Sequence, residues 1–181
     1  KGYFDGVNKD FSFANAYAPL DFGARRYCEA RVWSYFNMFT TRGNEFLPYI
    51  LGDTDTPMPL FVKPDRKISV QDVKNAMRDH YEGTPLDISK DFGAGPYHTP
   101  YRLSPLSFKV GDKEYFNERP ISTQQSGFVF VAQMRSTLPD AIGGVLWFGT
   151  DDANMTVFTP VYCCTDKVPV CYSRVDGADY I

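Results

Sequence analysis

The chain has 181 residues, of which 43% are hydrophobic and 23% are charged, and its formal net charge is −3. It is long enough to bury a core, and its composition is close to that of average globular proteins. The small negative charge without a basic stripe excludes nucleic acid as an expected partner. No apolar run approaches the roughly 20 residues that cross a bilayer, so no membrane partner is expected.

The first periodic pattern begins at Leu20, where apolar residues recur every three to four positions between three arginines and one glutamate. This spacing predicts an amphipathic helix of about five turns with a solvated polar face. The apolar face is made of Ala24, Cys28, Val32, Phe36 and Phe39. On this pattern Cys28 is a small buried apolar residue.

Residues 41–67 form a connection rich in Pro and Asp. Its apolar run at Leu60-Phe61-Val62 predicts that it packs over the core. A second helix is predicted after Ser69, because Ser69 and Asp72 have the spacing of a capping box. An apolar face running to Tyr81 then places His80 in the last helical turn, where a structural role near the helix dipole is favoured.

The second half of the chain is dominated by strand patterns. Residues 84–105 form a long loop rich in Gly, Pro and Tyr, and loops of this length are usually functional or ordered by a partner. A hairpin follows around Gly111-Asp112, and strands are predicted at 126–135, 144–149 and 155–162. The predicted fold class is α+β, with helices followed by a mainly antiparallel sheet. We expect a single partial domain, with helices and long loops at 1–105, antiparallel strands at 106–162 and an irregular tail at 163–181.

The four cysteines are too few for a disulfide scaffold. Cys163, Cys164 and Cys171 cluster without a CxxC pair or a nearby histidine, so neither a metal site nor a cofactor is expected. A Cys164–Cys171 bridge would favour an exported or periplasmic protein over a cytoplasmic one, but the sequence leaves the pairing and the compartment open.

Several long segments resemble one known family. They are FSFANAYAPLDFGARRYCEARVW, VKPDRKISVQDV, RDHYEGTPLD, NERPISTQQSGFVFVAQMR and LPDAIGGVLWFGTDDANMTVFTPVY. Together they cover the chain from about Phe11 to Tyr162, and they resemble the cysteine dipeptidase family of N-terminal nucleophile hydrolases, the dipeptidase A/secernin-like group. The resemblance implies part of a four-layer αββα sandwich and a thiol peptidase that hydrolyses dipeptides without a metal or cofactor.

In such hydrolases an N-terminal cysteine attacks the peptide carbonyl and its own α-amino group acts as the base. Lys1 occupies the first position here, and no initiator Met is present. We therefore expect a piece of a longer polypeptide whose nucleophile lies upstream, and we expect this piece alone to be inactive. The expected partners are a dipeptide and the remainder of the polypeptide, and a homo-oligomer is left open.

Six residues are candidates for contacting substrate. Arg119 can clamp a terminal carboxylate in bidentate fashion, although a surface ion pair with Glu118 or Asp112 is an alternative. Gln124 and Gln125 can donate to a substrate carbonyl or can satisfy neighbouring backbone groups.

The other three candidates lie between two predicted strands. Asp151, Asp152 and Asn154 can hold a substrate ammonium group, but these residue types also favour turns for structural reasons alone. No catalytic residue is assigned within the chain.

Two rival functions remain open. One is a non-catalytic β-rich module that binds a peptide or glycan on a platform made of the Tyr-rich loop 97–101 and Trp147. The other is an interaction protein that has lost catalysis. A separate expectation concerns the predicted sheet. If the upstream half of the polypeptide normally covers one of its faces, this piece should expose an apolar patch on Phe128, Phe130, Val145 or Trp147 and tend to associate.

Overall fold

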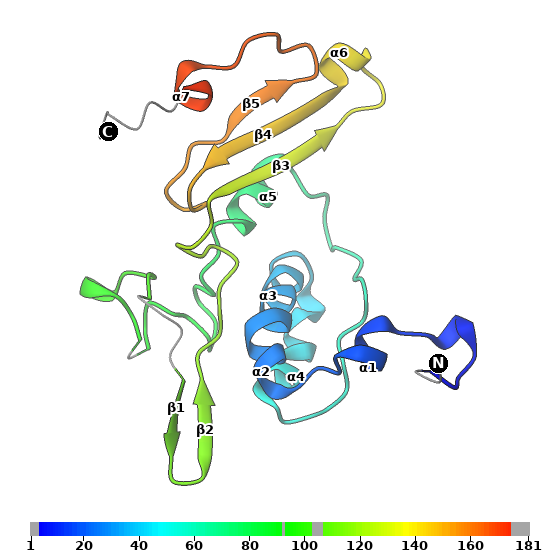
Figure 1. Cartoon of the computed structure of the whole chain (residues 1–181), viewed down its shortest axis with the longest axis vertical. Helices are drawn as coiled ribbons and strands as arrows, with labels where there is room; N and C mark the ends of the chain where they lie inside the picture. Colours follow the sequence, from blue (N-terminus) through cyan, green and yellow to red (C-terminus); the bar gives the residue numbers. More distant parts are fainter. Residues whose placement is uncertain (1–3, 92, 103–106, 175–181) are drawn as a thin grey trace. The chain divides into compact units, whose positions relative to one another are not determined.

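The computed structural model describes residues 4–91, 93–102 and 107–174. By its internal contacts the chain divides into two compact units, residues 1–125 and residues 126–181. Helices and antiparallel strands are both present (Figure 1), which confirms the α+β class. The arrangement as one partial domain with the expected boundaries stays a prediction.

The first unit is mainly helical. Its elements are η1 (Asn8–Asp10), α1 (Phe13–Tyr17), α2 (Phe22–Ala24), η2 (Arg25–Glu29), α3 (Ala30–Phe39), η3 (Thr41–Phe46), α4 (Leu47–Leu51), α5 (Val70–Ala76), η4 (Pro96–His98), β1 (Ser107–Val110) and β2 (Lys113–Phe116). Its buried apolar cluster joins α3 and α4 to the loop after α5, through Ala30, Trp33, Tyr49, Ile50, Tyr81, Leu86 and Ile88. The core of this unit therefore depends on a loop as much as on its helices.

The predicted first helix is confirmed, but its buried face is different. Elements α2, η2 and α3 follow one another without a break from Phe22 to Phe39. Trp33 and Ala30 are fully buried, whereas Cys28 and Val32 are exposed. One physical reason is that η2 is a π-helical turn, which holds more residues per turn than the 3.6-residue period assumed from the sequence.

The predicted second helix is also confirmed, with a shorter extent. Ser69 caps α5, and both hydrogen bonds of the capping box with Asp72 are present. The helix ends at Ala76, so His80 does not lie in its last turn as predicted. Beyond the helix, carboxylates accept main-chain N–H groups: Asp79 accepts that of Tyr81, and Glu82 accepts that of His80. Such local side-chain bonds compete with helix continuation.

The connection at 41–67 differs from the expectation. It begins with η3 and α4, so only the part after Gly52, where the main chain is left-handed with φ of 88°, is irregular. Leu60 and Phe61 are 94% and 80% exposed, so the predicted packing of this run over the core is wrong.

The β1–β2 hairpin forms as predicted. Val110 pairs with Lys113, and Gly111 has a φ of 61° in the turn, where a side chain would be strained. The hairpin belongs to the first unit and forms a separate two-stranded sheet.

The second unit is a three-stranded antiparallel sheet in the order β3–β4–β5 (Figure 1). Its elements are β3 (Phe128–Met134), α6 (Asp140–Gly143), β4 (Gly144–Thr150), β5 (Thr159–Tyr162) and α7 (Val170–Ser173). The first two strands match the prediction, and the third is shorter because a turn occupies its expected start. A short helix, α7, lies in the part of the chain predicted to be an irregular tail.

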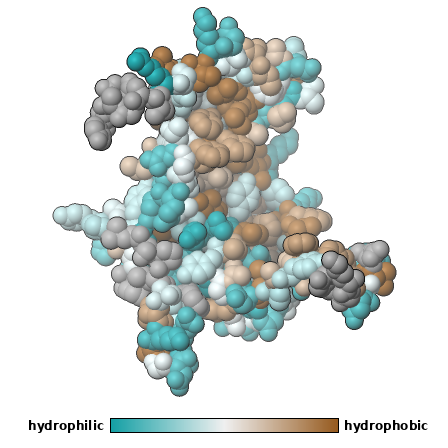
Figure 2. Space-filling view, in the orientation of Figure 1, coloured by the Kyte–Doolittle hydropathy of each residue, from teal (hydrophilic) through white to brown (hydrophobic). Residues whose placement is uncertain are grey.

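Both faces of this sheet are apolar. Because side chains alternate along a strand, Phe128 and Phe130 lie on one face, and Val129 and Val131 lie on the other. The phenylalanines are exposed and the valines are buried. Figure 2 shows apolar surface in the upper part of the view, where this sheet lies in Figure 1.

The predicted exposed patch is therefore half correct. Phe128 and Phe130 are exposed, whereas Val145 is only 3% exposed and Trp147 is partly buried. The latter two share the opposite face with Val131, because Val131 pairs directly with Trp147.

Candidate functional site

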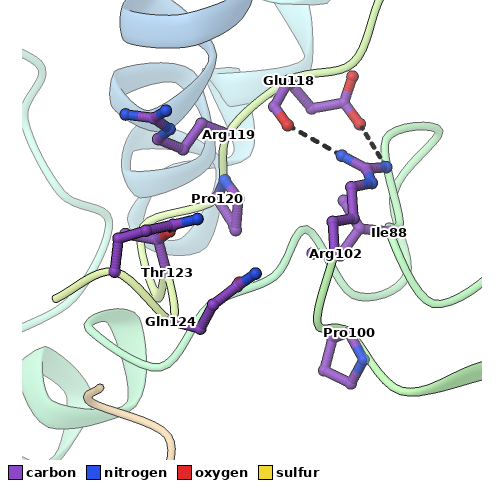
Figure 3. Close-up of a pocket in the computed structure, with 9 residues that line it drawn as sticks. Ile88, Pro100, Arg102, Glu118, Arg119, Pro120, Thr123 and Gln124 are labelled. Carbon is purple, nitrogen blue, oxygen red and sulfur yellow. Dashed lines mark hydrogen bonds and ion pairs between the residues drawn. The ribbon is translucent and has the colours of Figure 1, made fainter. Parts of the chain in front are cut away.

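A small pocket in the first unit brings together three of the six predicted substrate-contacting residues. The segment after β2 meets the loop that precedes β1, and residues from both line the pocket (Figure 3). The lining residues are Ile88, Pro100, Arg102, Glu118, Arg119, Pro120, Thr123, Gln124 and Gln125. Arg119, Gln124 and Gln125 thus lie on one wall, and their contact with a substrate stays a prediction.

A buried ion network supports one side of this wall. Glu118 is 5% exposed, and its carboxylate accepts from Arg26 at 2.7 Å and from Arg102 at 3.4 Å. Arg102 also pairs with Asp91, whose carboxylate accepts from the amide of Asn117 at 3.3 Å. Buried charges are tolerated when they are paired and hydrogen-bonded, and these carboxylates and guanidinium groups neutralise one another.

Sequence reasoning missed this network. The polar face of the first helix was predicted to be solvated, but the Arg26 side chain is only 12% exposed. Arg26 and Glu118 are 92 residues apart in the chain. No local pattern signals such a pair, since helical and strand periodicity report only on neighbours within a few residues.

Arg119 has a different environment from Arg102. It is exposed, and its guanidinium carbon lies 6.0 Å from the centre of the Tyr27 ring. In Figure 3 its side chain extends away from Arg102, to the other side of the segment. Glu118 is engaged with Arg26 and Arg102, so the alternative Arg119–Glu118 ion pair is wrong. Among the ion pairs of the described residues, none involves Arg119.

The two glutamines are exposed at the end of the same segment. Gln125 accepts a hydrogen bond from the hydroxyl of Thr123, so part of its amide has a local partner. The amide of Gln124 extends toward the side where Pro100 and Arg102 lie (Figure 3). An amide in this position can donate to a carbonyl or a carboxylate.

The pocket is small. Its cavity volume is about 20 Å³, which is room for about one water molecule. A dipeptide does not fit inside this hollow. A substrate that uses the wall would therefore have to lie across its mouth, against the exposed groups of Arg119, Gln124 and Gln125.

A buried acid of the first unit, Asp79, accepts hydrogen bonds from uncharged donors. The Asp79 carboxylate accepts from the Ser34 hydroxyl at 2.6 Å and from the Tyr81 main-chain N–H at 3.1 Å. Burial raises the pKa of Asp79 to about 6, and these two hydrogen bonds oppose the rise. His80 is buried beside it, with Nδ1 3.1 Å from Glu82.

The other three predicted residues lie in the second unit, after β4. Asp151 has a φ of 69°, and its carboxylate accepts the N–H of Asp152 at 2.9 Å. The carboxylate of Asp152 accepts the N–H of Asn154 at 3.3 Å. These bonds confirm a turn-stabilising role. Asp152 is buried, whereas Asp151 and Asn154 are exposed, and contact of any of the three with a substrate stays a prediction.

The aromatic platform of the rival binding module has mixed support. Tyr97 is almost fully exposed. Trp147 is partly buried, and its indole N–H donates to Gln133 at 3.2 Å within the sheet.

No metal site or membrane span is found in the part of the chain that the structure describes. There, no three or more His, Cys, Asp or Glu side chains are arranged to hold a metal ion. No described helix is long and apolar enough to span a membrane.

Comparison with known proteins decides the family. The model of peptidase family C69 matches residues 1–181. The chain belongs to peptidase family C69. The resemblance read from the sequence segments is thereby confirmed.

Similar members of known name are bacterial dipeptidases. A probable dipeptidase of Salmonella dublin is 30% identical over 162 residues, which is 90% of this chain and 32% of the relative. A probable dipeptidase B of Lactococcus lactis is 30% identical over 177 residues, which is 96% of this chain and 32% of the relative. Dipeptidase A of Lactobacillus helveticus is 28% identical over 145 residues, or 79% of this chain and 25% of the relative.

The chain spans about a third of the length of the first two of these relatives. No solved structure matches it.

In this member of peptidase family C69, three thiols can be placed. Cys28 lies exposed in η2, against the prediction that it is buried. Cys163 and Cys164 are exposed in the turn after β5. All three are free. The Cys164–Cys171 bridge considered from the sequence involves the side chain of Cys171, which lies outside the described part of the structure. None of the three lines the pocket that contains Arg119.

Proposed function

We propose that the polypeptide carrying this chain is a cysteine-type dipeptidase and that residues 1–181 supply one wall of its substrate site. The observation that carries the proposal is the family match over the whole chain, together with relatives named as dipeptidases. The structure supports it with an exposed arginine that has no carboxylate partner among the described residues, beside two exposed amides.

The chemistry of the wall suits a short peptide with a free carboxyl end. A guanidinium binds a carboxylate through two parallel hydrogen bonds, which gives orientation as well as affinity. Arg119 takes this role, and Gln124 and Gln125 donate to the carbonyl or carboxylate oxygens. Asp151, Asp152 and Asn154 form a separate group in the second unit, in which the exposed Asp151 carboxylate is best suited to an ammonium group.

The nucleophile is proposed to be an N-terminal cysteine outside residues 1–181. Each cysteine of the chain is internal, so its nitrogen is part of a peptide bond and cannot act as the base. Residues 1–181 alone are therefore expected to show no hydrolysis, with contacts to substrate as their contribution.

The test compares the complete natural polypeptide with residues 1–181 on dipeptides, with release of free amino acids as the measurement. We expect turnover by the complete polypeptide, its loss on alkylation of the nucleophile, and no turnover by residues 1–181. Robust turnover by residues 1–181 would overturn the assignment of the nucleophile.

A substitution tests the wall itself. Arg119→Gln in the complete enzyme should raise KM for a dipeptide by about tenfold or more, because a charge-assisted hydrogen-bonded pair is lost. Arg42→Gln is the matched control, since Arg42 is an exposed arginine paired with Glu45 and does not line the pocket. Peptide binding by a complete polypeptide that does not hydrolyse would favour the rival binding module.

A further inference from the structure

The wall segment that carries Arg119 is held in place by side chains from elsewhere in the first unit. Residues 117–120 belong to no helix or strand. Two consecutive main-chain carbonyls in this segment each accept a side-chain donor. Arg102 donates to the carbonyl of Glu118 at 2.9 Å, and the hydroxyl of Tyr81 donates to the carbonyl of Arg119 at 2.6 Å. The path of the wall is therefore set by these donors and not by a sheet.

Tyr81 is fully buried and has a strained main chain. Its φ is 64°, which is uncommon for a bulky residue and costs about 1–3 kcal/mol. The surroundings hold it there. Its N–H donates to Asp79 at 3.1 Å, and its carbonyl accepts from the Thr84 hydroxyl at 2.7 Å. Its ring stacks with that of Trp33, with 6.4 Å between the ring centroids.

Burial raises the pKa of the Tyr81 hydroxyl far above its usual range. The hydroxyl therefore stays protonated at any working pH and always donates. This short hydrogen bond links the buried core directly to the main chain of Arg119. A strained residue held by several contacts and directed at one atom of the wall is typical of a functional constraint.

We propose that Tyr81 is a positioning residue for Arg119. Its hydroxyl fixes the Arg119 main chain and so holds the guanidinium ready for a substrate carboxylate. The inference rests on the proposed function, because that carboxylate is the group Arg119 is proposed to bind. Without the hydroxyl, Arg102 still donates to the carbonyl of Glu118, but the carbonyl of Arg119 loses its donor. The arginine must then be ordered when the substrate binds, and the entropy cost of this ordering weakens binding.

The test uses the complete natural polypeptide and measures binding, so that it does not depend on turnover. The probe is an alanyl-alanine analogue with a reduced peptide bond, which cannot be hydrolysed, compared with the same compound as its C-terminal amide. Dissociation constants are measured by titration calorimetry, and each variant is also melted to check that it is folded.

Tyr81→Phe keeps the ring and removes only the hydroxyl. Loss of one hydrogen bond predicts about three- to tenfold weaker binding of the free acid, with binding of the amide unchanged within about twofold. Tyr49→Phe is the control, because Tyr49 is a buried tyrosine of the same core that does not line the pocket. It should leave the preference for the free acid unchanged.

The combination with Arg119→Gln decides whether Tyr81 acts through Arg119. The double variant should bind the free acid as weakly as Arg119→Gln alone, within about twofold, since the two residues form one unit. Additive losses, or a lowered melting temperature with an unchanged preference for the free acid, would mean that Tyr81 is only a core residue, and the inference would be overturned.

The outcome that would contradict the proposed function differs from the outcome that would contradict the role of Tyr81. A complete polypeptide that binds the analogue but releases no amino acids from dipeptides is not a dipeptidase, while the binding constants still judge Tyr81. If wild-type protein does not distinguish the free acid from the amide, Arg119 is no carboxylate site and the inference is overturned.

Discussion

The two units of this chain use their side chains in opposite ways. The first buries charged groups and pairs them, as Arg26 and Arg102 do with Glu118, and it leaves Arg119 exposed beside them. The second buries aliphatic side chains on one face of its sheet and exposes Phe128 and Phe130 on the other. The comparison teaches that the exposed group beside the ion network of the first unit is a cation, suited to a small anion, whereas the exposed face of the second unit's sheet is apolar, suited to packing.

The largest effect is expected where the first unit buries charge. Glu118→Gln leaves two largely buried arginines without this carboxylate, and breaking a buried pair costs about 3–5 kcal/mol of the free energy of unfolding. Urea unfolding measures the change. Glu45→Gln is the control, because it removes an exposed pair with Arg42, and such pairs contribute about 0–1 kcal/mol. Similar losses for both variants would show that the network contributes no more than a surface pair.

The next effect is a pH dependence set by Asp79. Burial raises its pKa in the folded state to about 6, above an unfolded value of about 4, so the folded state binds the proton more tightly. The contribution is fully present below about pH 4 and is lost as pH rises through about 6. The free energy of unfolding should fall over this window by about 2–3 kcal/mol relative to Asp79→Asn, which lacks the titration.

Measurement of both proteins by urea unfolding at several pH values isolates this residue. The neighbouring carboxylate of Glu82 contributes in the opposite direction, since its hydrogen bonds with His80 lower its pKa against the effect of burial. The difference between wild type and Asp79→Asn removes that contribution, apart from the repulsion between the two carboxylates, which is one of the causes that raise the pKa of Asp79. A difference that stays constant from pH 4 to 6 would contradict the raised pKa of Asp79.

The sequence predicted those features that depend on neighbouring residues. The capping box of Ser69 and Asp72 and the turn at Gly111 need only three or four positions, and both are present. The pairing of Arg26 with Glu118 could not be predicted, because it depends on how distant segments meet. The exposure of Cys28 was missed because a π-helical turn changes the helical period locally.

The candidate site divides in the same way. Residue type alone pointed to the arginine and the amides of the wall, and their contact with a substrate stays a prediction. The role proposed for Tyr81 could not be predicted, since neither its left-handed main chain nor its bond to the Arg119 carbonyl leaves a pattern in the sequence.

A smaller effect is expected at a helix start of the first unit. Ser69→Ala removes the side-chain oxygen that accepts the Asp72 N–H, and loss of such a cap costs about 1 kcal/mol. Ser12→Ala is the comparison, because Ser12 caps α1, a helix with no buried residue. Unfolding in urea should show a measurable loss for Ser69→Ala and a smaller one for Ser12→Ala. The reverse order would mean that packing of the capped helix does not matter.

The smallest effect on stability is expected on the exposed face of the second unit, where the effect on association should be clear. Phe130→Thr keeps a residue that favours strands and removes an exposed ring, so the free energy of unfolding should change by less than about 0.5 kcal/mol. Light scattering should show weaker self-association and a dye for apolar surfaces should bind less, because the exposed apolar area is smaller.

Val131→Thr, one residue along the strand, places a hydroxyl on the buried face and should cost about 1–3 kcal/mol without reducing dye binding. If Phe130→Thr instead destabilised the chain as much as Val131→Thr, both faces of the sheet would be packed, and the contrast between the two units would be wrong.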